Sequence, residues 1–183
     1  MLVIHTPRLA LRTWRPADAE AFHAMNQDPR VIEHLPGPMS MQQVADFMAM
    51  QNALYERSGS CYLAATLAAG GALIGFVGLK RHAGGLPFAP CTDIGWRLGA
   101  DYWGNSYARE AAAACLHHGF ERLGLDEIVS FTVPQNLRSR ALMERLGMRR
   151  DEAGDFAHPA LPAGHRLSGH VLYRLRRGEF APA

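Results

Sequence analysis

The sequence predicts a mixed α/β fold, in which helices flank a mixed β-sheet. Short runs with the period of a strand alternate along the chain with longer stretches of helical period. A Gly-rich turn at residues 69–71 joins two of the strand-like runs into a hairpin. The chain has 183 residues, of which 48% are hydrophobic and 20% are charged, as expected for one globular domain with a full core. We therefore expect a single domain over residues 1–183.

Local signals predict the order of the elements. A proline near its start favours a helix over residues 16–26, and Ser40 is placed to cap a second helix over residues 40–57. Two further helices are expected over residues 107–123 and 136–146. Strands are expected over residues 9–13, 62–67, 72–80, 92–98, 128–133 and 171–175. The segment 155–169 is rich in Pro, Gly and His and is predicted to be a flexible loop.

Charge and composition argue against several kinds of partner. The net charge is only +2 and the basic residues form no run, which argues against nucleic-acid binding. The apolar stretches are too short for a membrane span, and Arg8 and Arg12 interrupt any signal-peptide pattern. The three cysteines are widely separated and lack a C-x-x-C spacing, as expected for a reduced, cytoplasmic protein. We expect a monomer or a homodimer.

Metal and covalent chemistry are not expected from these residues. His117 and His118 are adjacent, so they point to different faces of a helix and cannot share a metal ion in the usual way. None of the cysteines lies at an expected helix N-terminus, so nothing there supports a route through an acylated thiol. We therefore expect no metal cofactor and no acyl-enzyme.

Two polar stretches carry the candidate site. In the first, the strand over residues 92–98 ends in small residues and leads into a helix, whose free backbone N–H groups and dipole suit a phosphate or pyrophosphate. Arg109 is a cation at the positive end of this helix, a placement that makes more sense if a phosphate lies nearby. In the second stretch, Asn136 and Ser139 begin another helix. The pair of stretches predicts a pyrophosphate-bearing cofactor that lies along a strand. The expected N–H donors are those of Gly104, Asn105, Ser106, Tyr107 and Ala108.

These motifs resemble those of the GNAT N-acetyltransferases, which bind acetyl-CoA. The phosphate loop of that family is usually [RQ]-x-x-G-x-[GA], and residues 101–106 occupy it here. Gly104 matches the pattern, Asp101 replaces the usual Arg or Gln, and Ser106 replaces the usual Gly or Ala but is still small. Residues 6–31 and the pattern Asn136-x-x-Ser139 are similar to the RimJ/RimL-type branch, which acetylates the N-terminal α-amines of ribosomal proteins. The resemblance implies a central mixed, mostly antiparallel twisted sheet of about six to seven strands.

The resemblance also implies roles for the site residues. Many GNAT enzymes use a Tyr to protonate the leaving thiolate, but Met143 stands at that position here, so Ser139 is the expected proton donor. Asn136 would bind the pantetheine amide or the acetyl region. Helix capping alone would also explain Asn136 and Ser139. The strand residues expected to pair with pantetheine through their backbone are Ile94, Trp96 and Leu98, and Trp103 is also expected to bind the cofactor.

The sequence offers several candidates for the general base. Asp93 at the start of the central strand is one candidate, and a base that acts through water is equally compatible with the sequence. An α-amine has a pKa of about 8, against about 10.4 for a lysine side chain, so acetylation of an α-amine needs only a weak base. The other candidates are Glu33, His34 and His82.

We expect direct transfer from acetyl-CoA to a primary amine, with the N-terminal α-amine of a protein or peptide as the preferred acceptor. The alternatives are a small amine, such as an aminoglycoside, a polyamine or an amino-acid derivative, and a non-catalytic CoA-binding regulatory module. A peptide acceptor predicts an open groove between residues 33–41 and the loop 155–169. A small amine predicts a closed pocket with an acidic patch.

Overall fold

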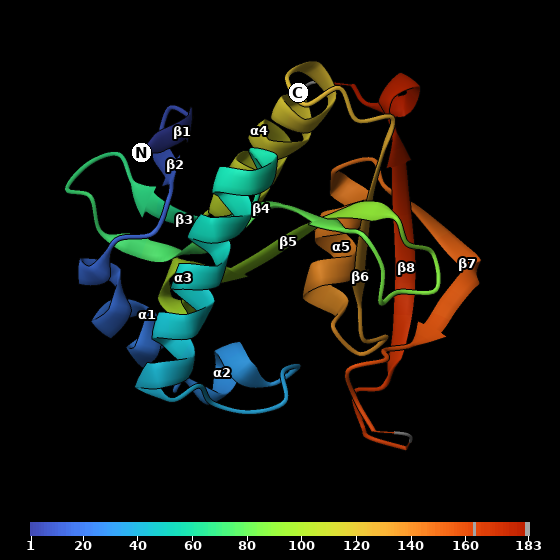
Figure 1. Cartoon of the computed structure of the whole chain (residues 1–183), viewed down its shortest axis with the longest axis horizontal. Coiled ribbons are helices and arrows are strands. Elements are labelled where there is room, and N and C mark those ends of the chain that lie inside the picture. Colours follow the sequence, from blue (N-terminus) through green and yellow to red (C-terminus); the bar gives the residue numbers. More distant parts are fainter. Residues whose placement is uncertain (163, 182–183) are drawn as a thin grey trace.

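The computed structural model describes residues 1–162 and 164–181, which form one eight-stranded sheet. The strands lie in the order β1-β2-β3-β4-β5-β6-β8-β7 (Figure 1). Neighbouring strands are antiparallel except β5 and β6, which are parallel. The predicted mixed, mostly antiparallel sheet is confirmed, with one strand more than the expected range. The strands are β1 (Leu2–His5), β2 (Leu9–Arg12), β3 (Tyr62–Leu67), β4 (Leu73–His82), β5 (Cys91–Leu98), β6 (Glu127–Thr132), β7 (Arg149–Ala157) and β8 (Gly169–Arg176).

Helices cover both faces of this sheet. Figure 1 shows α3 (Met41–Ser58) in front of the sheet, with α1 (Ala19–Met25) beside it, and α4 (Tyr107–Glu121) behind. The predicted helices are all present within a few residues of the expected bounds. Among the described residues, no helix combines the length and the apolar content needed to cross a membrane. The remaining helices are α2 (Pro29–Ile32) and α5 (Leu137–Arg145), with 3-10 turns at Pro16–Asp18, Ala100–Tyr102 and Arg177–Glu179.

Each face of the sheet has its own hydrophobic cluster. The cluster under α4 contains the helix residues Leu116 and Phe120, both buried, and Ile94 of β5. The cluster under α1 and α3 contains Phe22 of α1 and Phe76 of β4, with ring centroids 6.2 Å apart. Successive residues of β5 therefore face different surroundings, because neighbouring side chains along a strand point to opposite faces.

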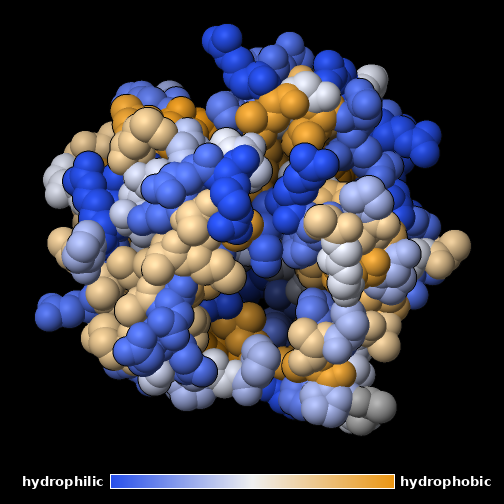
Figure 2. Space-filling model, viewed as in Figure 1, coloured by the Kyte–Doolittle hydropathy of each residue, from blue (hydrophilic) through white to orange (hydrophobic). Residues whose placement is uncertain are grey.

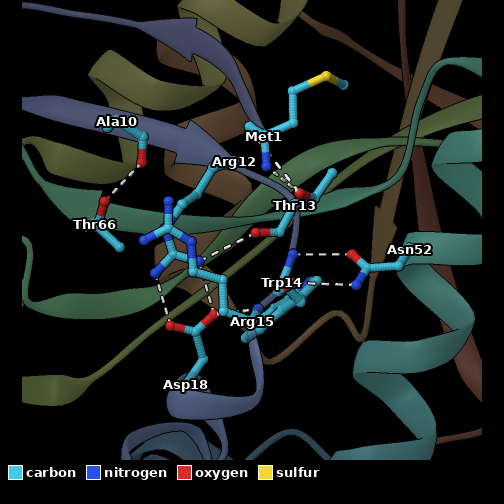
Figure 3. Close-up of polar contacts among 9 residues, drawn as sticks. All are labelled: Met1, Ala10, Arg12, Thr13, Trp14, Arg15, Asp18, Asn52 and Thr66. Atoms are coloured by element: carbon cyan, nitrogen blue, oxygen red, sulfur yellow. Dashed lines mark hydrogen bonds and ion pairs between the residues drawn. The ribbon is translucent and has the colours of Figure 1, made fainter.

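A buried ion pair fixes the chain between β2 and α1 (Figure 3). The two terminal nitrogens of Arg12 donate to the two carboxylate oxygens of Asp18, each at 2.7 Å. The backbone N–H of Arg15 donates to the same carboxylate at 2.7 Å. Burial raises the pKa of Asp18, but the bonds from Arg12 and Arg15 lower it more, so the pKa lies below its ordinary value of 3.8. Asn52 of α3 also binds the backbone of Trp14 at 2.9 and 3.0 Å, which ties this segment to α3.

Three elements were not predicted from the sequence. β1 and α2 have only four residues each, too few to show a clear period. β7 begins with the charged run R-R-D-E, and its burial alternates weakly, so it has no strand-like apolar pattern. It forms because it pairs with β8, where Arg174 Nε donates to Asp151 at 2.7 Å.

The prediction of a loop over residues 155–169 was therefore partly wrong. Residues 155–157 complete β7, and Gly169 already belongs to β8. Phe156 and Ala157 register with His170 and Gly169 across the strand pair. Ala163, which also falls in the predicted loop, lies outside the described residues.

Candidate functional site

Strands β5 and β6 separate soon after they meet, which opens the sheet. Their parallel pairing registers Asp93 with Val129, and Ser130 Oγ donates to the carbonyl of Ile94 at 2.9 Å. Beyond this point, within the described residues, Trp96 has a strand partner on β4 but none on β6. Alternate residues of a strand direct their backbone groups to the same side. The N–H and C=O of Trp96 therefore point, like the carbonyl of Ile94, away from β4 and into the opening.

The first turn of α5 forms the opposite wall of this opening. Asn136 caps the helix: its Oδ1 accepts from the N–H of Ser139 at 3.2 Å, and its Nδ2 donates to Thr132 Oγ1 at 3.1 Å. Trp96 Nε1 donates to Ser139 Oγ at 3.3 Å, which connects β5 to α5 across the opening. Because Oγ accepts this bond, the hydroxyl proton of Ser139 stays available for donation. Figure 2 shows the surface hollowed between α3 and α5.

The capping role of Asn136 is thus confirmed, while its contact with pantetheine stays a prediction. The side-chain oxygen and nitrogen of Asn136 are both engaged inside the protein. The same bonds fix the backbone at Ser139 and direct the start of α5 toward β5. Asn136 therefore positions Ser139, whatever else it binds.

The segment between β5 and α4 presents a row of free backbone donors. Gly104 and Ser106 both have left-handed backbones, with φ of +79° and +62°. A Cβ added at Gly104 would meet no atom within 4 Å, so the space above this residue is open. Within residues 1–162 and 164–181, the N–H groups of residues 104–109 donate to no protein acceptor. A row of free donors at the positive end of a helix is a binding site for phosphate.

Two arginines that the sequence did not identify as site residues border this row. Arg138 of α5 stacks its guanidinium on the Trp103 ring, 4.5 Å from the centroid, and Trp103 Nε1 donates to the carbonyl of Leu98 at 2.9 Å. Arg8 Nη1 donates to the carbonyl of Asn105 at 3.1 Å. No local pattern marks these arginines, because the fold brings them to the loop from distant parts of the chain.

The acidic residue in the phosphate-loop pattern is partly neutralised. Asp101 is 83% exposed, and its Oδ1 accepts from Arg30 Nη2 at 3.1 Å. Arg30 is shared with Asp28, whose carboxylate it binds at 2.6 Å. An exposed charge of this kind is strongly screened by solvent, so its repulsion of a nearby phosphate is small.

Asp93 lies buried where the opening begins and has two side-chain partners. The hydroxyl of Tyr62 donates to Asp93 Oδ2 at 2.5 Å, and His82 Nε2 lies 3.1 Å from Oδ1. Burial, followed by the charge and hydrogen bond of Asp93, raises the pKa of the Tyr62 phenol well above 10. Tyr62 therefore remains a proton-carrying donor that holds the carboxylate in place.

The fold thus brings two of the candidate bases, Asp93 and His82, into contact. Asp93 is only 4% exposed, so a substrate amine cannot reach it easily. Among the described residues, His82 Nδ1 has no protein partner, and it is not sealed from solvent. Glu33, by contrast, is exposed and lies 3.8 Å from His34 Nε2, without a contact to Asp93 in the described chain. Sequence reasoning missed Tyr62, which has no neighbour in the sequence that suggests this contact.

A bridge joins the two segments that were expected to border the acceptor. Arg166, in the segment before β8, donates through Nη1 to the carbonyl of Glu33 and through Nη2 to that of Leu35, both at 3.1 Å. The space between these segments is therefore crossed by a side chain rather than open along its whole length.

The thiols have the properties of structural cysteines. Burial raises the pKa of Cys61 and of Cys115 to about 12, and burial together with Asp93 raises that of Cys91 to about 11. Such thiols are protonated at neutral pH and are poor nucleophiles. In the part of the chain that the structure describes, no group of three or more His, Cys, Asp or Glu side chains is arranged to hold a metal ion.

Comparison with known proteins gives consistent matches over most of the chain. A family model described as an acetyltransferase (GNAT) domain matches residues 8–149. YnaD of Bacillus subtilis (strain 168), described as an uncharacterized N-acetyltransferase, is 25% identical over 177 residues, which cover 97% of this chain and 98% of YnaD. A GNAT-family acetyltransferase structure from Bacillus anthracis is 27% identical with a TM-score of 0.80 and covers 98% of this chain and 100% of that one. RimL, a ribosomal α-N-protein acetyltransferase in complex with coenzyme A, shares the fold at 15% identity, with a TM-score of 0.78 over 96% of this chain and 98% of its own.

Proposed function

The chain belongs to the GNAT acetyltransferase family, and on this premise we propose that it transfers the acetyl group of acetyl-CoA directly to a primary amine, preferably the N-terminal α-amine of a protein or peptide. One observation carries the proposal. The opening between β5 and α5 leads at one end to the free N–H groups of residues 104–109 and at the other to the buried Asp93 carboxylate. A donor with a pyrophosphate at one end and a thioester at the other fits such a site.

The proposed contacts with acetyl-CoA use backbone groups that the protein leaves without an internal partner in the described residues. Trp96 offers a backbone N–H and C=O to the amides of the pantetheine arm, in the place that a neighbouring strand would occupy. Ile94 and Leu98 are less available, because their carbonyls already accept from Ser130 and from Trp103. The N–H groups from Gly104 to Ala108, with the cations of Arg109 and Arg138 nearby, hold the phosphates. This arrangement of donors is the support for acetyl-CoA as the co-substrate.

In the proposed reaction the amine nitrogen attacks the thioester carbonyl, the C–S bond breaks, and the thiolate leaves. Ser139 donates its hydroxyl proton toward the departing sulfur and then regains a proton from solvent, while the bond from Trp96 Nε1 stabilises the oxygen in between. His82 Nδ1 accepts the proton of the amine, directly or through a water molecule. Asp93 binds the other ring nitrogen and stabilises the imidazolium that forms, so it acts through His82.

The acceptor is proposed from the shape of the site. The Arg166 bridge restricts access along the segment after α2, so an acceptor has to present its amine at the end of a chain or on a small molecule. A peptide N-terminus meets this condition and needs only a weak base. A small amine also meets it, and the bridge is the observation that favours this second candidate.

Acetylation of matched acceptors distinguishes these functions. We would measure thiol release from acetyl-CoA with a peptide that has a free N-terminus, with the same peptide blocked at its N-terminus but carrying an internal lysine, and with a set of polyamines and aminoglycosides. The proposal expects turnover only with the free N-terminus. Turnover confined to small amines would replace it by the second candidate. Tight acetyl-CoA binding without turnover on any acceptor would instead favour a non-catalytic CoA-binding module.

Variants of His82 test the proton path. His82→Gln should lower kcat by about 100-fold near neutral pH, because the amine loses its proton acceptor, and should leave the affinity for acetyl-CoA unchanged. His117→Gln is the matched control, since His117 is exposed on α4. If the pH profile of kcat/KM keeps the same acidic limb in His82→Gln, water is the base and His82 has no part in the mechanism.

A further inference from the structure

The guanidinium of Arg97, on β5, has neighbours of an unusual kind for a partly buried cation. Its Nη1 donates to Asn26 Oδ1 and lies 3.5 Å from Met39 Sδ, and the group stacks on the Phe76 ring at 5.4 Å from the centroid. These neighbours are an amide, a thioether and an aromatic ring. Within the described residues, no carboxylate lies within ion-pair distance of Arg97.

Other partly buried arginines of this chain do have carboxylate partners. Arg12 binds Asp18 at 2.7 Å, Arg150 binds Asp155 at 2.5 Å, and Arg174 binds both Asp151 and Glu127 at 2.7 Å. A guanidinium that is withdrawn from water without a counter-charge is costly. The cost is visible at Arg97, where burial lowers the pKa to about 10. An anion from outside the chain would remove this cost.

Part of the Arg97 guanidinium is free to receive such an anion. In the described chain, its Nε and Nη2 atoms donate to no protein acceptor, and neither is sealed from solvent. These two nitrogens form the edge of the guanidinium that binds a carboxylate through two parallel hydrogen bonds. Arg97 therefore offers an unoccupied bidentate site for a carboxylate.

The position of Arg97 links this site to the acceptor. Asp93, Gly95 and Arg97 are alternate residues of β5, so they share the face of the sheet that carries α1 and α3. Tyr62 covers Gly95: a Cβ there would lie 2.9 to 3.1 Å from the Tyr62 ring. Asp93 and Arg97 thus lie on either side of the position that the Tyr62 ring covers. Their Cα atoms are about 13 Å apart along the strand.

We propose that Arg97 binds a carboxylate of the acceptor, so that the preferred acceptors are amines with an acidic group several bonds away from the reacting nitrogen. The inference rests on the proposed acetyl transfer and specifies its substrate. A peptide with Asp or Glu as its second residue meets this condition, because its carboxylate lies about two residue lengths, roughly 7 Å, from the terminal amine.

Binding of product-like peptides tests the proposal independently of turnover. The probes are two N-acetylated, C-terminally amidated tripeptides, Ser-Asp-Ala and Ser-Asn-Ala, titrated calorimetrically into the protein in the presence of CoA. The wild-type protein is expected to bind the Asp peptide about tenfold more tightly or better, as a charge-assisted bidentate contact provides. Arg97→Gln should abolish this preference, and Arg97→Lys should keep part of it. Arg81→Gln, which removes an exposed cation from the neighbouring strand, should keep the wild-type preference.

Equal binding of the two peptides by the wild-type protein, a preference that survives in Arg97→Gln, or no binding of either peptide would each overturn the proposal. Thiol release with the corresponding unacetylated peptides separates the two levels of inference. Turnover with equal kcat/KM for the Asp and Asn peptides would leave acetyl transfer in place and remove Arg97 from acceptor recognition. An Arg97-dependent binding preference without any turnover would keep Arg97 as a carboxylate-binding residue and remove the proposed acetyl transfer.

Discussion

Replacing Gly104 by alanine separates the stability of the fold from the affinity for acetyl-CoA. The new methyl group would meet no atom of the protein within 4 Å, so the folded chain has room for it. The backbone at this residue has a φ of +79°, which disfavours alanine by about 1–2 kcal/mol. For a chain of this size, about 1 kcal/mol corresponds to a change in Tm of about 2–4 °C. We therefore expect Gly104→Ala to unfold about 2–8 °C below the wild-type protein.

The effect on the cofactor should be larger than this. The methyl group would occupy open space within the segment whose N–H groups are free, where the proposed binding mode brings a phosphate oxygen close to the backbone. A hydrogen bond to a charged group contributes about 1.5–3 kcal/mol, so the loss of even one bond lowers affinity by about 10–100-fold. Calorimetric titration with acetyl-CoA measures this directly.

Gly70 supplies a matched control in the turn between β3 and β4. Its φ is +80°, and a Cβ added there would also meet no atom within 4 Å. Gly70→Ala should therefore show a similar decrease in Tm, measured by circular dichroism, and bind acetyl-CoA as tightly as the wild-type protein. If both variants bind acetyl-CoA with wild-type affinity, the segment 104–109 does not bind the phosphates, and the proposed orientation of the donor is wrong.

Three further results are expected. Ser139→Ala should lower kcat by about 10–100-fold with little change in acetyl-CoA affinity, because the leaving thiolate loses its proton donor; an unchanged kcat in a thiol-release assay would exclude this role. Asp18→Asn should lower the free energy of unfolding in urea by about 2–4 kcal/mol, because the buried Arg12 loses its counter-charge; a decrease below about 1 kcal/mol would mean that solvent screens the pair. Acid should reproduce the same loss of stability, because folding lowers the pKa of Asp18. The stability that the Asp18 carboxylate contributes is complete above the ordinary pKa of 3.8, and it disappears as the pH falls through the lower pKa of the folded protein. Between about pH 5 and about pH 2 the wild-type protein should therefore lose more stability than Asp18→Asn, and parallel curves would contradict this assignment.

Local patterns in the sequence determined much of the fold and the cofactor half of the site. The amphipathic periods of α3 and α4 and the Ser40 cap depend on residues within a few positions of one another, so they are readable without a fold. The same holds for the left-handed turn at Gly104 and for the capping contact between Asn136 and Ser139. These features indicate a strand that leads to a helix start with free donors, which is the basis for predicting a phosphate site there.

The tertiary structure decided which side chains from separate strands come together at the proposed site. β7 is charged and shows no strand pattern, and it forms a strand by pairing with β8, where Arg174 binds Asp151. The sheet register brings His82 and Tyr62 to the two carboxylate oxygens of Asp93, a contact that no local pattern in the sequence indicates. The amide of Asn26 and the thioether of Met39 likewise become neighbours of the Arg97 guanidinium only through the tertiary fold. Contacts between side chains on separate strands depend on strand order and register, and these are set by the packing of the whole chain rather than by any short segment of it.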